Sequence, residues 1–119
     1  MLGDFFTATF HTPGTLAANQ DIKFKLPFDA SLAFVSAVAS NASNAILDVG
    51  NSDAAEAYVK NLDVGDSGTP AVLDEEGDFE GDVYPHITKG TIIAIALDFD
   101  GASGTAAQNF TLVLGFTKG

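Results

Sequence analysis

The stretch Phe110-Thr111-Leu112-Val113-Leu114-Gly115-Phe116-Thr117 decides the fold class of this chain. Its large apolar side chains alternate with threonine, valine or glycine, and this period of two is that of a β-strand with one buried face. The same alternation over residues 91–99 (TIIAIALDF) predicts a second strand. We expect these two strands to pair, with the Gly/Ser/Thr-rich residues 100–109 as an exposed loop between them.

Further strand-like runs precede these two, separated by turns rich in Gly, Pro, Asn and Asp. They lie near 4–11, 21–28, 31–40, 45–49, 57–60 and 83–88. Asp53 followed by Glu56 also fits the start of a helix, so a turn or two of helix over 54–61 is an alternative there.

Many short strands without a long helix predict one all-β domain over residues 1–119. The expected architecture is an antiparallel β-sandwich that is jelly-roll-like, with an immunoglobulin-like sandwich as the alternative. Residues 1–10 are expected to form an N-terminal arm or an edge strand of this domain.

Composition favours a packed domain and narrows its partners. Of the 119 residues, 46% are hydrophobic and 18% charged, which supports a core and argues against disorder. Sixteen Asp and Glu against five Lys give a net charge of −11, so nucleic acid and anionic membranes are disfavoured as partners. The chain has no cysteine, and its beginning lacks the basic and apolar regions of a secretory signal, which predicts a soluble protein made without one.

The segment Asp74 to Asp82 (DEEGDFEGD) holds six carboxylates in nine positions. Asp78, Glu80 and Asp82, at i, i+2 and i+4, are able to converge oxygen ligands on Ca²⁺ from one side of an extended loop. The segment lacks the EF-hand pattern, so a solvated charged loop is the other interpretation. We predict no other cofactor.

The sequence contains none of the common motifs of catalytic residues that we considered. His11 and His86 lie far apart in the sequence and form a metal pair only if the fold brings them together; otherwise they are polar turn residues close to prolines. No serine lies in a G-x-S-x-G elbow, and the glycine-rich residues 101–104 are not followed by the lysine of a phosphate-binding loop. The sequence therefore predicts a protein that is not an enzyme.

Three blocks of the chain resemble small structural proteins of tailed-bacteriophage virions, most of all capsid decoration or stabilisation proteins. They are Tyr84 to Gly119 (YPHITKGTIIAIALDFDGASGTAAQNFTLVLGFTKG), Phe10 to Asn41 (FHTPGTLAANQDIKFKLPFDASLAFVSAVASN) and the link VGNSDAAEAYVKNLDVGDSGTPA. The resemblance implies a jelly-roll-like sandwich that binds the outside of an assembled head and holds capsid subunits together. It implies the virion, assembled in the host cytoplasm, as location, and the major capsid protein or other virion subunits as partners. It also implies a homo-oligomer, a trimer above all.

Three segments are candidates for the surface that contacts such partners. The apolar N-terminal residues Leu2, Phe5 and Phe6 are the first choice, the acidic segment 74–82 is the second, and Lys23 with Lys25 is the third. Two alternative functions remain: a phage tail or head-fibre protein, which shares such β-rich patterns, and a calcium-dependent binding or adhesion module using loops 74–82 and 98–109.

Overall fold

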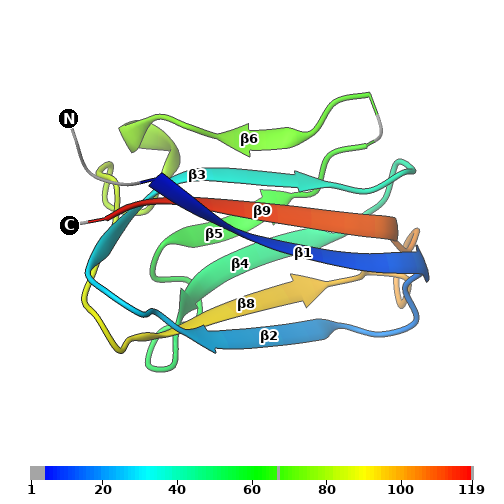
Figure 1. The fold of residues 1–119 in the computed structure, drawn as a ribbon. Coiled ribbons are helices and arrows are strands. Elements are labelled where there is room, and N and C mark those ends of the chain that lie inside the picture. Colours follow the sequence, from blue (N-terminus) through cyan, green and yellow to red (C-terminus); the bar gives the residue numbers. More distant parts are fainter. Residues whose placement is uncertain (1–4, 67, 119) are drawn as a thin grey trace.

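A computed structural model describes residues 5–66 and 68–118 as two antiparallel β-sheets packed face to face (Figure 1). This confirms the predicted all-β sandwich. The elements are β1 (Phe5–Thr15), β2 (Gln20–Lys25), β3 (Ala30–Val38), β4 (Ile46–Asn51), β5 (Val59–Asp63), β6 (Ala71–Leu73), the short 3-10 helix η1 (Glu76–Asp78), β7 (His86–Ile87), β8 (Ile92–Asp98) and β9 (Gln108–Lys118). Within the described residues, no helix is long and apolar enough to cross a membrane.

The strands divide between two sheets that we call the β1 sheet and the β2 sheet. The β1 sheet has the order β1-β9-β3-β6, and β7 also pairs with β3. The β2 sheet has the order β2-β8-β4-β5. The chain crosses between the sheets at almost every connection, and only β4 with β5 and β6 with β7 are consecutive strands of the same sheet.

The core lies between the two sheets and is built from the alternation seen in the sequence. In β9, Phe110, Leu112, Leu114 and Phe116 are at most 1% exposed, because their side chains all point toward the facing sheet. Ile93, Ile95 and Leu97 of β8 fill the same core from the other side. No polar or charged residue is buried among the described residues.

The predicted pairing of the last two strands is wrong. Strand β8 pairs with β2 and β4, whereas β9 pairs with β1 and β3, so residues 99–107 carry the chain from one sheet to the other. Both strands bury one face, and this pattern is the same whether two strands pair side by side or face each other across a core. Alternation in the sequence therefore shows that one face of a strand is buried, but it does not show which strand lies beside it.

The helical alternative over residues 54–61 is wrong, and one strand of the structure was not predicted. Residues 54–61 form no helix, because the Asn51 side chain accepts hydrogen bonds from the backbone N–H groups of Asp53 and Ala54, closing a turn that leads into β5. Strand β6 went unpredicted, since three residues are too few to show an alternation.

Substitution of Gly50 tests how tightly the chain packs at the end of β4. A Cβ at this position would overlap the backbone carbonyl of Ala54. A backbone group cannot move aside as the end of a flexible side chain can. We expect Gly50→Ala to lower the free energy of unfolding by about 2–3 kcal/mol in urea denaturation. Gly77→Ala is the matched control: its Cβ meets nothing within 4 Å, so its effect should stay within about 1 kcal/mol. Equal stabilities of the two variants would contradict the packing described here.

Candidate functional site

The outer face of the β1 sheet is made of rows of uncharged side chains that cross the strands. In one row Thr9 pairs with Val113, Val113 with Ser36, and Ser36 with Val72, so four strands each contribute one side chain. Because the inner residues of β1, β9 and β3 pack on the core, these residues point outward. The parallel rows are Phe5, Thr117, Ser31 and His86; Thr7, Gly115 and Phe34; and His11, Thr111 and Val38.

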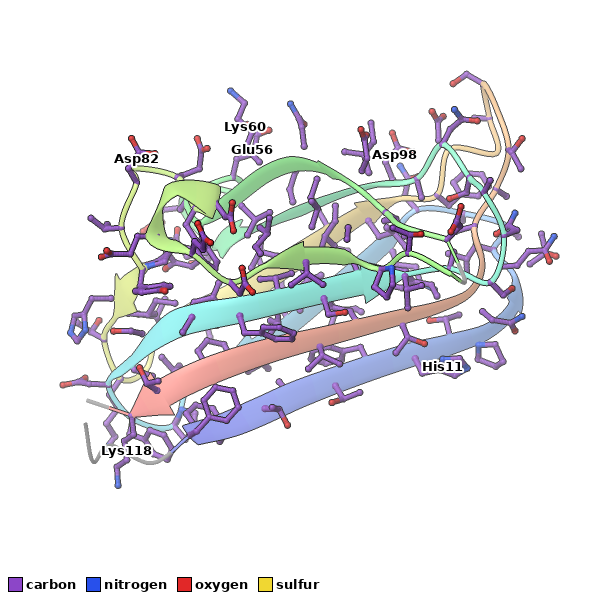
Figure 2. All side chains as sticks on the ribbon, turned by 90° about the horizontal axis from the view of Figure 1, so that it is seen from above. His11, Glu56, Lys60, Asp82, Asp98 and Lys118 are labelled. Carbon is purple, nitrogen blue, oxygen red and sulfur yellow. The ribbon has the colours of Figure 1, made fainter. Side chains whose placement is uncertain are left out.

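The β2 sheet differs in charge. Its strands carry Asp21, Lys23, Lys25, Asp48, Lys60, Asp63 and Asp98, whereas the charged residue in the strands of the β1 sheet is Lys118, at the end of β9. Figure 2 shows Glu56, Lys60 and Asp98 on the side of the β2 sheet and His11 beside β1, on the opposite side. In a chain of net charge −11, the described residues of these four rows therefore include no carboxylate and no ammonium group.

This difference in charge determines which of the two sheet faces another protein covers at the lower cost in free energy. Removing a charged group from water costs several kcal/mol unless a partner compensates it, and charged residues are depleted at the centre of protein interfaces. Threonine, serine, valine and phenylalanine carry no such penalty. The four rows, which we call the uncharged face, are therefore the best candidate for a docking surface.

The structure separates the two histidines. His11 lies opposite Thr111, and its Nδ1 is 2.8 Å from the Thr111 hydroxyl oxygen. His86 lies in the row of Thr117, six residues further along β9, so the two rows are about 20 Å apart along the strands at 3.3 Å per residue, and the rings are further separated across β9 and β3. They do not form a metal pair.

The acidic segment is fastened to the sandwich at its middle. Phe79 is 2% exposed, and the Glu80 backbone N–H donates to the Tyr58 carbonyl at 3.1 Å. The Asp78 carboxylate accepts backbone N–H groups of Asp74 and Glu75, both at 3.1 Å, and so caps η1. The buried ring of Phe79 therefore anchors this segment, although no alternation of apolar residues around it in the sequence indicates that role.

The three carboxylates predicted to bind Ca²⁺ are not gathered into a site. Among the described residues, no group of three His, Cys, Asp or Glu side chains is placed to hold a metal ion. Asp78 is engaged with the backbone, while Glu80 and Asp82 are exposed. A calcium site would require this segment to rearrange.

Thermal unfolding with and without calcium tests whether the folded protein binds the ion through the acidic segment. We expect millimolar Ca²⁺ to leave the Tm at its value in EDTA, because an ion stabilises a protein only by binding the native state. Mg²⁺ at the same concentration controls for general screening of the acidic residues. A rise in Tm with Ca²⁺ alone would show that the segment does gather around the ion.

The predicted contact residues have different surroundings. Leu2 lies outside the described residues. Phe5 is 56% exposed on the uncharged face, but Phe6 points inward and stacks on Phe116 with ring centroids 5.0 Å apart. Lys23 and Lys25 are exposed on β2, and the Lys23 ammonium is 3.6 Å from the Asp21 carboxylate.

A polar depression of about 390 Å³ is lined by Ser52, Asp53, Tyr58 and His86, among others. These residue types match a hydrolytic triad, which requires a serine hydroxyl hydrogen-bonded to the imidazole. Across residues 5–66 and 68–118 no hydrogen bond joins Ser52, Asp53 and His86. The depression does not present the contacts of a triad.

Comparison with known proteins shows a likeness of fold. The structure is similar to that of a chain in the cyanophage Pam1 capsid asymmetric unit, with a TM-score of 0.57 and 18% sequence identity. The alignment covers 100% of this chain and 89% of that chain. No protein-family model and no curated protein sequence matches. The two chains thus share a fold over nearly their whole lengths.

Proposed function

We propose that this chain is a non-catalytic structural protein of a phage virion, which binds the outside of the assembled capsid as a decoration protein and docks through the uncharged face. The observation that carries the proposal is that face: a broad sheet surface without charge in a chain of net charge −11. The likeness in fold to a chain of a cyanophage capsid supports the virion as its setting.

The strand order supports a jelly roll within the sandwich class. The chain passes back and forth between the sheets, including at its last two strands, β8 and β9. In an immunoglobulin-like sandwich the last two strands share a sheet, so that alternative fits less well. Jelly rolls occur in viral capsid proteins, which agrees with the proposed setting.

The size of the uncharged face suits binding by several copies. Three long strands give this face dimensions of about 35 Å by 15 Å. Treated as flat, it has an area of roughly 500 Å². A standard interface buries about 800 Å² per partner, so one copy makes a modest contact. We therefore propose that the protein acts as a homo-oligomer, a trimer as the resemblance implies, because linked copies raise the overall strength of binding. The charged β2 sheet then faces solvent, where its charge repels neighbouring phage particles.

Two lysine substitutions test which face docks. Val113→Lys places an ammonium group at the centre of the uncharged face, and Ala96→Lys places the same group at the centre of the β2 sheet; both positions are half-buried on central strands. We expect Val113→Lys to weaken binding to heads of the encoding phage assembled without this protein about tenfold or more, because the charge is buried without a partner. Ala96→Lys should bind as the unchanged chain does.

The measurement is co-sedimentation of each variant with the heads, after circular dichroism has shown that both are folded. Normal binding by Val113→Lys together with loss of binding by Ala96→Lys would assign docking to the opposite face. Failure of the unchanged chain to bind heads, with binding to purified tails instead, would replace decoration with a tail role.

A further inference from the structure

We propose that copies of this chain join head to tail, with the flank formed by β1 and β2 of one copy packing on the opposite flank of the next, where β5, β6 and the acidic segment lie. This inference deepens the oligomer of the proposed function by naming the surfaces that join its copies. The contact uses the sides of the sandwich and leaves the uncharged face available.

The β1–β2 flank has an unprotected strand edge. Strand β1 is 11 residues long and, within the described part of the chain, pairs only with β9, so about half of its backbone groups face away from the sheet. It contains no lysine or carboxylate, and its irregular register and proline are confined to its last residues, Thr12 to Thr15, so that residues 5–12 form a regular open edge. Soluble proteins usually protect such edges with charge, bulges or short length.

The other sheet edges carry those protections. Strand β2 bears Asp21, Lys23 and Lys25, β6 is only three residues long, and β5 is short, charged and paired to β4 through an irregular register. The β1 edge is thus the one that requires a cover, and a second protein chain is able to supply it.

Aromatic side chains fill the space between β1 and β2. Phe6 meets Phe28 edge-on with centroids 4.9 Å apart, and Phe10 lies 5.9 Å from Phe24. All four rings are only half-buried, because within residues 5–66 and 68–118 no further strand covers this side of the sandwich. Covering them would add apolar burial to any contact made here.

Three of the five lysines also belong to this flank. Lys23 and Lys25 extend from β2, and the Lys118 ammonium lies 4.9 Å from the centre of the Phe28 ring. Among the described residues, Lys25 and Lys118 have no carboxylate within 4 Å. The positive charge of a strongly acidic chain is therefore concentrated beside its uncovered edge.

The opposite flank has the complementary charge. Strand β6 leads directly into the acidic segment, and Figure 1 shows η1 and β6 at the end of the molecule opposite β2. Glu76 and Glu80 are exposed there, and neither makes an ion pair within residues 5–66 and 68–118. A second copy thus offers carboxylates to the lysines of the first.

The two flanks differ, so the contact is heterologous and closes into a ring only if the rotation between copies permits. Two copies cannot satisfy both contacts at once, since the flanks lie on opposite sides of each sandwich. We therefore expect a ring of three or more copies, which is compatible with the proposed trimer.

Charge exchange tests the contact in the purified protein. Lys23→Glu with Lys25→Glu should reduce the mass measured by light scattering from that of the oligomer to that of the 12.3 kDa chain. Adding Glu76→Lys and Glu80→Lys should restore the oligomer, because the attraction is re-formed with opposite sign. The four changes together return the net charge to −11, so overall charge does not explain a recovery.

The matched control is Ala42→Glu, Ala102→Glu, Ser103→Glu and Thr105→Glu at exposed positions of the β3–β4 and β8–β9 loops, which lowers the net charge by four, as the first pair does, but lies outside both flanks; it should keep the oligomer. A monomeric unchanged chain, or an oligomer unaffected by Lys23→Glu with Lys25→Glu, would overturn the inference. So would a folded fourfold variant that stays monomeric. Capsid docking is judged separately by the sensitivity of head binding to Val113→Lys.

Discussion

Burial of the inner side of β9 is the interaction on which the rest of the structure depends. Phe110, Leu112, Leu114 and Phe116 lie in the core with at most 1% exposure, and each contributes roughly 1.5–3 kcal/mol by leaving water. That sum is comparable to the whole net stability of a typical domain, about 5–15 kcal/mol. β9 also pairs with β1 on one side and β3 on the other, so both neighbours depend on its position.

The same constraint produces the uncharged face. Because side chains alternate along a strand, fixing the inner residues of β9 fixes Thr111, Val113 and Thr117 on the outer side. β1 and β3 enter the sheet in a register that sets Thr9 and Ser36 beside Val113. The proposed docking surface therefore follows from core packing, with no separate element required to build it.

Charge is organised around this architecture. With sixteen acidic and five basic residues, most carboxylates have no basic partner, and Lys23 with Asp21 is the ion pair found in the described part of the chain. Within residues 5–66 and 68–118, the acidic groups lie on the β2 sheet, in turns and on the β5–β6 flank. This distribution leaves two surfaces with few carboxylates: the uncharged face, which we propose binds a capsid subunit, and the β1–β2 flank, which we propose binds a second copy.

The sequence by itself determined the strand class, most strand positions and the core. Period-two alternation in β2, β8 and β9 reports a buried face directly, because a polar residue at an inner position would cost several kcal/mol. It did not reveal the proposed docking surface, because Thr9, Ser36 and Val113 lie far apart in the sequence and become neighbours only in the folded sheet. The tertiary structure alone decided that β9 joins β1 and β3 rather than β8, because pairing depends on how distant segments complete one core. Neighbouring strands in the chain thus separate into opposite sheets, and the face that they leave uncharged exists only once the sandwich has formed.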